Sequence, residues 1–203
     1  MTTRRLCLNT LLSLSCLAGI GPCFALEAAD LLHIKIGAVI TVADPKGEAP
    51  LREITVTHVH PVRADGTVWY QINATSGAEQ EEVLYADLNA NPPKLETVLR
   101  KVILRKLVDR PRKFLDAVED AEKGEMVMDE VTYRYNDKES DGGVFEPDGD
   151  KTKAFEFNYL VFTSTQDASL SIQVMRWSED KFDTYLVRQM RPSDVKLKSK
   201  NLD

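Results

Sequence analysis

The chain has 203 residues, of which 43% are hydrophobic, and its 32 acidic and 26 basic side chains give a net charge of −6. This length is enough for one domain, or two small ones, each with its own hydrophobic core. The acidic balance argues against general nucleic-acid binding, which needs a basic surface.

The first 25 residues have the layout of a secretory signal peptide. Arg4 and Arg5 precede an uncharged run over residues 6–20, and a Gly-Pro break and the small residue Ala25 follow it. We expect cleavage after Ala25 and export of the mature chain to the periplasm or the medium. The apolar run is shorter than the about 20 residues of a membrane-spanning helix, so we expect no transmembrane segment after cleavage.

All three cysteines, Cys7, Cys16 and Cys23, lie in this predicted signal segment. The mature chain is therefore expected to contain no disulfide, no thiolate metal site and no cysteine nucleophile. It keeps 24 basic and 32 acidic residues, so its net charge is −8.

Residues 26–91 carry the two-residue periodicity of strands and predict an antiparallel N-terminal β-meander. Turn sequences with Gly or Pro separate most of its alternating runs. These runs cover residues 34–42, 53–60, 68–75 and 82–88. The second run is rich in β-branched residues, and we expect Pro61 to end it.

Between residues 92 and 124 the period changes to 3.6 and predicts a helical connector. A first helix is expected from Leu95 to Leu107. Its apolar face would consist of Leu95, Val98, Leu99, Val102, Ile103 and Leu107. A second helix is expected to begin at Pro111 and to end at Gly124.

From residue 125 to residue 203 the period of two returns and predicts a second β-meander. It includes an antiparallel hairpin of residues 169–177 and 181–189, followed by a short strand at 195–197. The expected fold is therefore α+β and β-rich, with two antiparallel β-meanders joined by a helical pair. A weak similarity between the two halves allows them to be duplicated small barrels or sheets.

Four features of the C-terminal part occur in a fixed order: a Tyr-x-Tyr strand, an aromatic strand, a Ser-Ile strand that ends in Trp, and a last strand after a tight turn. Here they are Tyr133-Arg134-Tyr135, Phe157-Asn158-Tyr159, Ser171-Ile172 through Trp177, and Phe182-Asp183-Thr184-Tyr185. In these features residues 124–197, about a third of the chain, resemble a family of uncharacterised bacterial β-rich domains, a domain of unknown function. The resemblance implies a β-rich fold and no known activity.

Residues 137–148 resemble an EF-hand calcium loop in spacing, with acids at loop positions 1, 3, 5 and 12 and glycine at position 6. The flanking patterns are those of strands, and Asp148 stands where an EF-hand has the longer Glu. We therefore expect an acidic hairpin loop in which Gly142 and Gly143 take positive φ angles. Weak calcium binding is the alternative.

His58 and His60 are expected on one face of a strand, because residues i and i+2 project to the same side. Two imidazoles can begin a zinc or copper site, and His33 or Asp65 could supply a third ligand. No third ligand stands at a recognisable spacing, so polar contacts at a sheet edge are expected and metal binding is the alternative.

Most aromatic residues fall in predicted strands, where core packing and cross-strand pairs are expected and a sugar- or peptide-binding platform is the alternative. The chain has no Gly-x-Ser-x-Gly, no His-Glu-x-x-His and no Gly-rich phosphate loop. We therefore expect no catalytic residue and no cofactor. The expected function is a non-catalytic interaction or accessory module, with a metal- or calcium-binding protein and a hydrolase as alternatives.

Residues 100–113 hold seven basic side chains and one acid in an otherwise acidic chain. On the expected helix, two apolar residues fall opposite the apolar face and inside a basic rim. Such a patch suits an acidic protein partner or an anionic membrane surface, whereas pairing with acidic stretches of the same chain is the alternative. The candidate partner-binding residues are Arg100, Lys101, Leu104, Arg105 and Val108.

Overall fold

The structure is a computed structural model that describes residues 24–25, 34–43, 52–64, 67–76, 81–87, 94–191 and 194–197. The strands of this part of the chain form one antiparallel sheet. Most of the predicted signal segment lies outside the described residues, so its cleavage stays a prediction. In the described part, no helix is long and apolar enough to span a membrane.

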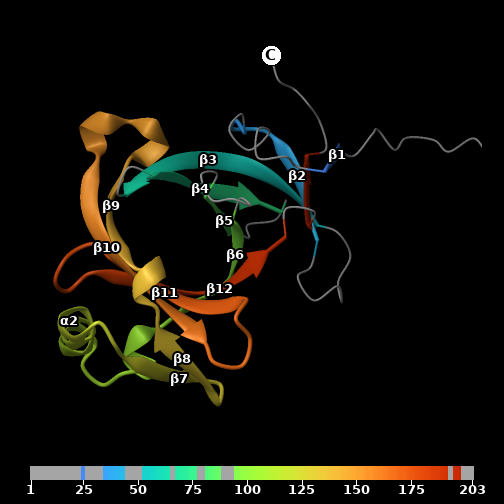
Figure 1. The fold of residues 1–203 in the computed structure, drawn as a ribbon. Coiled ribbons are helices and arrows are strands. Elements are labelled where there is room, and N and C mark those ends of the chain that lie inside the picture. The colour runs from blue at the N-terminus through green and yellow to red at the C-terminus, as the bar shows by residue number, and fades with distance from the viewer. Residues whose placement is uncertain are drawn as a thin grey trace, which may run out of the picture.

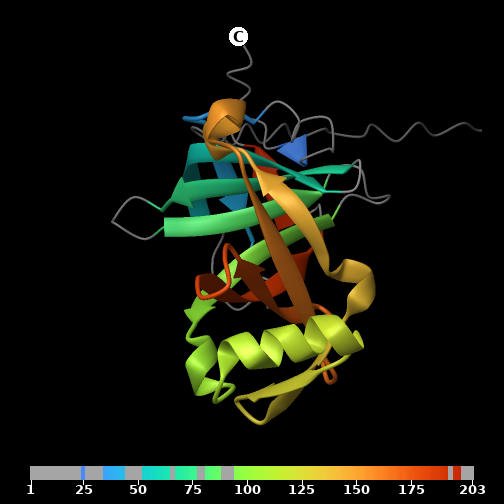
Figure 2. The ribbon, with the colours of Figure 1, turned by 90° about the vertical axis from the view of Figure 1, so that its left-hand side faces the viewer.

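Eight strands of this sheet close into an antiparallel barrel, seen along its axis in Figure 1 and from the side in Figure 2. The ring order is β3-β4-β5-β6-β12-β11-β10-β9, and β9 pairs back with β3. The strands are β3 (Arg52–Ala64), β4 (Thr67–Thr75), β5 (Glu81–Asp87), β6 (Lys94–Val102), β9 (Asp141–Phe145), β10 (Phe155–Ser164), β11 (Leu170–Arg176) and β12 (Phe182–Met190). Closure pairs the two edges that an open sheet would expose.

The barrel combines strands from both halves of the chain. Strand β6 pairs with β12, with Leu95 opposite Met190, and Val62 of β3 lies opposite Phe145 of β9. The expectation of a β-rich antiparallel fold is confirmed. The expectation of two meanders joined by a helical pair is not, because the two groups of strands share one closed sheet and the described residues contain a single α-helix.

The first helix expected, from Leu95 to Leu107, is instead strand β6 followed by a 3-10 turn, η1 (Leu104–Lys106). Alternate residues of β6 serve two buried regions: Leu95 packs in a cluster outside the barrel, whereas Val98 packs against the interior. Apolar residues are therefore needed on both faces of β6. Along the sequence, the two sets together resemble the 3.6-residue period of a helix. Pairing with β5 and β12 overrides this local pattern.

The helix of the described part, α2 (Pro111–Ala121), begins at Pro111 as predicted. It ends before the expected Gly124, because Glu122 already takes a left-handed conformation with φ of 50°. Gly124 has a different role, since a Cβ atom at this position would collide with the side chain of Val118 in α2.

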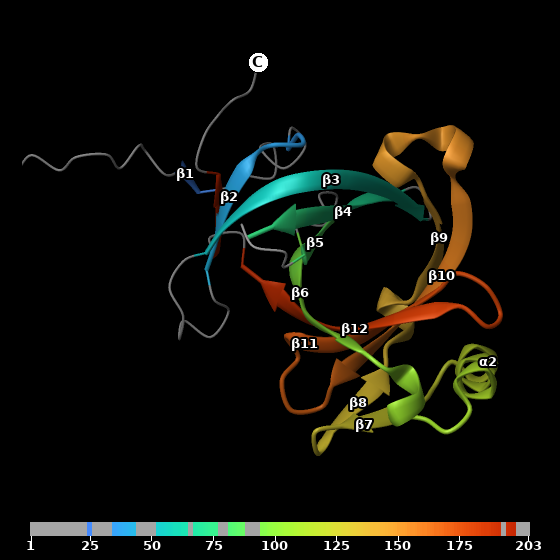
Figure 3. The ribbon, with the colours of Figure 1, turned by 180° about the vertical axis from the view of Figure 1, so that it is seen from behind.

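Helix α2 packs on the outside of the barrel, where β7 (Glu125–Met128) and β8 (Val131–Tyr135) extend the sheet beside β10 (Figure 3). Leu115 and Val118 of α2 are buried in the same cluster as Phe162 of β10 and Leu104 of η1. A second outer cluster lies under β2 (Val39–Val42) and includes Ile40. Beyond β2 the sheet continues through β13 (Val195–Leu197) to β1 (Phe24–Ala25).

The interior of the barrel holds a third apolar cluster, to which every ring strand contributes at least one side chain. Its buried members are Val62, Tyr85, Phe145, Phe157, Met175 and Val187. Many ring strands therefore bury both of their faces, one against this cluster and one against an outer cluster.

The acidic segment 137–148 is not the hairpin loop expected from the sequence. It contains a 3-10 turn, η2 (Asp137–Glu139), then β9, the strand that closes the barrel. Gly142 and Gly143 belong to this strand and do not take the positive φ expected of them. Glycine is needed at 143 because a Cβ atom there would lie 3.1 Å from the carbonyl oxygen of Arg63 and 3.2 Å from Cε1 of Phe157.

Strand β3 continues past Pro61, which was expected to end it. Pro61 lies opposite Tyr70 of β4, and its carbonyl accepts the backbone N–H of Glu146 at 3.0 Å. The predicted hairpin of β11 and β12 is confirmed, with Gln173 opposite Tyr185. Strands are also found at the other predicted β-runs, with ends shifted by up to a few residues.

Candidate functional site

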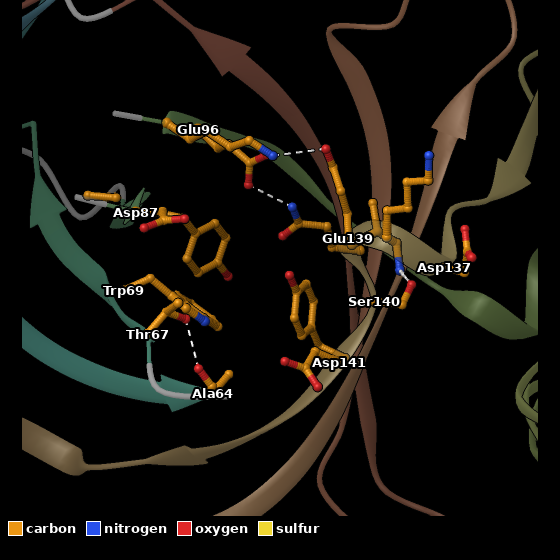
Figure 4. A pocket seen from close by; sticks show the side chains of 16 residues that line it. Ala64, Thr67, Trp69, Asp87, Glu96, Asp137, Glu139, Ser140 and Asp141 are labelled. Atoms are coloured by element: carbon orange, nitrogen blue, oxygen red, sulfur yellow. Dashed lines mark hydrogen bonds and ion pairs between the residues drawn. The ribbon is translucent and has the colours of Figure 1, made fainter. Parts of the chain in front are cut away.

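A cavity of about 430 Å³ lies at the end of the barrel where β3 ends and β4, β6 and β9 begin (Figure 4). Its lining comes from β3, β4, β5, β6, β9, β10, β11 and the segment that precedes β9. Small-molecule sites in proteins typically enclose roughly 300 to 1,000 Å³. The width of an eight-stranded barrel is enough for packed side chains or for one small ligand.

Strand geometry directs the polar lining residues into the barrel. Glu96 of β6 lies opposite Tyr85 of β5, and Trp69 of β4 lies opposite Asp87 of β5. Because successive side chains of a strand point to opposite faces, Glu96 enters the barrel while its neighbour Leu95 packs in the outer cluster.

Glu96 is held by the amide of Gln173, whose Nε2 donates to Oε2 at 2.7 Å. Burial raises the pKa of Glu96, and the hydrogen bond from Gln173 offsets only part of this rise. The charges of Glu139 and Asp87 act in the same direction as burial, whereas Lys94 opposes them. The direct partner of this carboxyl group is thus a neutral amide.

Three aromatic rings stand beside this carboxyl group. Trp69 meets Tyr85 edge to face, with ring centroids 5.7 Å apart and planes at 80°, and it meets Tyr159 at 5.8 Å and 55°. Burial raises the pKa of both tyrosines, and the charge of Glu96 raises it further. Both phenols therefore stay protonated at neutral pH and present neutral rings to the cavity.

The acidic segment before β9 forms the opposite wall. The hydroxyl of Ser140 donates to the carbonyl of Asn136 at 2.7 Å and accepts the N–H of Val161 at 2.9 Å, which fixes η2 to β10. Figure 4 shows Glu139 and Asp141 on the side of the cavity that faces Glu96.

An ion pair joins the two walls. Nζ of Lys94 lies 2.9 Å from Oε1 of Glu139, and the side chains are 44% and 39% exposed. The hydrogen bond from this ammonium group raises the pKa of Lys94. The pair is therefore accessible to water, as expected for groups at the entrance of the cavity.

The candidate partner-binding residues lie outside this cavity. Lys101 pairs with Asp183 at 2.6 Å and Arg100 pairs with Asp129, while Arg105 is exposed. Arg100 and Lys101 thus pair with acids of the same chain, Asp129 and Asp183, but not with the acidic stretch at residues 119–122. Whether a partner binds this surface stays a prediction.

The prediction that Leu104 and Val108 form an exposed apolar pair is wrong. Leu104 is 3% exposed and belongs to the cluster beneath α2, and Val108 packs against the same cluster. Ile103, which was expected to face the core, is 58% exposed. The error follows from treating a strand and a 3-10 turn as one continuous helix.

His58 and His60 share a face of β3 as predicted, and their rings stack with centroids 5.6 Å apart. His60 is buried, and its Nδ1 accepts the backbone N–H of Asp148 at 2.8 Å. Among the residues that the structure describes, no group of three His, Asp or Glu side chains is placed to hold a metal ion.

The cavity residues were not identified from the sequence as a site. Glu96 fell inside an expected helix, Gln173 inside a hairpin, and Glu139 and Asp141 inside an expected loop. The available signal was the alternation of polar and apolar residues in Lys94, Leu95 and Glu96, which is typical of a strand.

We found no protein family, no curated protein and no solved structure that matches the chain. The resemblance of residues 124–197 to bacterial β-rich domains therefore remains an expectation.

Proposed function

We propose that the protein is an exported, non-catalytic accessory module that binds one small polar molecule in the mouth of its barrel. The observation that carries this proposal is the cavity of about 430 Å³, in which aromatic rings and charged groups lie together. Binding sites of this size typically combine apolar walls with a few placed polar groups.

The fixed position of the walls supports binding. Most of the lining belongs to strands of the closed barrel, and the acidic segment before β9 is tied to β10 through Ser140 and Asn136. A site whose groups are already in place loses little conformational entropy when a ligand enters.

The base of the cavity also supports binding of a single molecule. Below Trp69 the interior is filled by the buried cluster that includes Phe157, Met175 and Val187. A ligand therefore enters and leaves by the same end of the barrel, and it cannot occupy the whole lumen.

The proposal is tested by ligand binding to the mature chain. Saturation-transfer NMR is measured with glucose, choline, putrescine and citrate, which represent neutral, cationic and anionic small molecules. At least one class should bind and be recovered unchanged. Cleavage of the molecule would support the hydrolase alternative, and binding of none of them would contradict the proposal.

A variant that fills the cavity tests whether the ligand binds there. Thr67→Trp places a large ring at the exposed start of β4, in the lining of the cavity, and should weaken binding at least about tenfold. Thr55→Trp is the matched control, because Thr55 is an exposed strand residue that does not line the cavity. Equal binding by both variants would place the ligand elsewhere.

Export is tested separately, by sequencing the N-terminus of the protein recovered from its native cells. We expect the mature chain to begin at Leu26, the residue after the predicted cleavage point. Recovery of soluble cytoplasmic protein that retains Met1 would contradict this part of the proposal.

A further inference from the structure

The cavity is lined by more acidic than basic side chains. Five carboxylate side chains line it, against two lysines. One of these lysines, Lys94, is already paired with Glu139. An anionic ligand would add to the negative charge of the cavity and a neutral ligand would leave it unchanged, whereas a cation would reduce it.

The aromatic rings of the cavity favour the same ligand charge. The planes of Trp69 and Tyr85 are nearly perpendicular, and the plane of Tyr159 is tilted by 55° from that of Trp69. Rings inclined in this way form adjoining walls instead of a stack. The face of an aromatic ring carries negative potential and attracts ammonium groups.

Glu96 gives the cavity a charged group beside these walls. Its side chain is half-buried, and its hydrogen-bond donor is the neutral amide of Gln173. Burial raises its pKa, which means that its negative charge is poorly solvated at this position. A cation placed next to it would supply the stabilisation that water supplies to an exposed carboxylate.

We propose that the ligand of the barrel mouth is a small organic cation with an ammonium group, which lies between the carboxylate of Glu96 and the rings of Trp69 and Tyr159. This inference rests on the proposed function, because it names the chemical class of the molecule that the cavity binds. The ammonium group forms a charge-assisted contact with Glu96, and its alkyl substituents contact the rings.

The test compares choline with 3,3-dimethylbutan-1-ol, which has the same shape but no charge. Isothermal titration calorimetry of the mature chain at pH 8 should give choline an affinity at least about tenfold higher, because its neutral isostere lacks the attraction to Glu96 and to the rings. Putrescine extends the test to protonated primary amines. Equal affinity for choline and its isostere would overturn the proposal.

Glu96→Gln removes the charge and retains the shape and hydrogen-bonding capacity of the side chain. Choline binding should weaken at least about tenfold in this variant, while binding of the neutral isostere should not change. Glu156→Gln is the matched control, because Glu156 is an exposed glutamate of β10 outside the cavity. Unchanged choline binding by Glu96→Gln would overturn the role of this carboxylate.

The outcomes separate this inference from the proposed function. If glucose or citrate binds and the Thr67→Trp variant prevents it, but choline and putrescine do not bind, the ligand is not a cation and the binding function stands. If none of the probes binds, the proposed function and this inference both fail.

Discussion

Gln173 of β11 donates a hydrogen bond of 2.7 Å to Glu96 of β6, across the intervening strand β12. Gln173 itself is 5% exposed. Because β12 lies between β6 and β11, the bond connects two strands that are not neighbours in the sheet. It holds the carboxyl group of Glu96 in a position where burial raises its pKa.

The first prediction concerns the pH dependence of stability. Glu96 has a higher pKa in the folded chain than in the unfolded chain, where it is about 4.3. Its contribution to stability is thus complete below that pH and is lost as the pH rises through the raised value. Glu96→Gln removes this loss, so the variant should gain stability relative to wild type as the pH rises above about 4.3.

Urea denaturation at several pH values measures this difference. The other charged groups near Glu96, namely Lys94, Asp87 and Glu139, are present in both proteins, so their effects largely cancel in the comparison. Glu156→Gln controls for the general effect of removing one negative charge. A stability difference for Glu96→Gln that stays constant with pH would show that this carboxyl group is well solvated.

The second prediction concerns two neighbouring residues between β6 and α2. Leu104 is 3% exposed and packs beneath α2, so Leu104→Ala should lower the free energy of unfolding by about 2 to 5 kcal/mol. Ile103 is 58% exposed, and Ile103→Ala should change it by less than about 0.5 kcal/mol. Chemical denaturation of both variants measures the effect, and the reverse order would support the continuous helix.

The third prediction concerns the strand that closes the barrel. In Gly143→Ala the new methyl group would lie 3.1 Å from the carbonyl oxygen of Arg63, a backbone atom of the neighbouring strand. We expect a loss of about 1 to 3 kcal/mol. Gly142→Ala is the control, because its nearest neighbour is the side-chain oxygen of Asn158 at 3.3 Å, which can move. Equal melting temperatures for the two variants would contradict the close approach of β9 and β3.

The fourth prediction concerns the attachment of α2. Arg176 of β11 is 12% exposed in its side chain and pairs with Asp116 at 2.7 Å and Glu119 at 2.6 Å, both on α2. Arg176→Gln should lower the free energy of unfolding by about 2 kcal/mol, since both charge-assisted bonds are lost from a largely buried position.

Arg112, a more exposed arginine on α2 itself, provides the control. The side chain of Arg112 is 48% exposed and pairs with Glu179 at 2.6 Å, so Arg112→Gln should cost at most about 0.5 kcal/mol. Hydrogen exchange should speed up over residues 111–121 in Arg176→Gln alone. If both variants exchange alike, the buried arginine does not hold the helix.

Local patterns in the sequence were sufficient for structure formed between near neighbours along the chain. The hairpin of β11 and β12 followed from alternation on either side of a short polar turn. The start of α2 followed from Pro111, whose fixed φ and missing N–H suit the first turn of a helix. These features depend on backbone preferences and on contacts within about 20 residues.

Closure of the barrel depended instead on contacts between distant segments. Pairing of Val62 with Phe145 turned part of an acidic segment into β9, and pairing of Leu95 with Met190 made a strand of a segment with a helical period. The preference of a segment for strand depends on the neighbours it packs against, so no local pattern specifies it. The cavity residues come together through the same distant contacts.

By itself, the sequence determined that the protein is β-rich, antiparallel and acidic, because alternation and charge are properties of short segments. Only the tertiary structure decided that Glu96, Trp69 and Glu139 surround one cavity, that Leu104 is buried and that Gly143 must lack a side chain. Each of these depends on which strands become neighbours when the sheet closes, and closure is set by the packing of the whole chain rather than by any one segment of it.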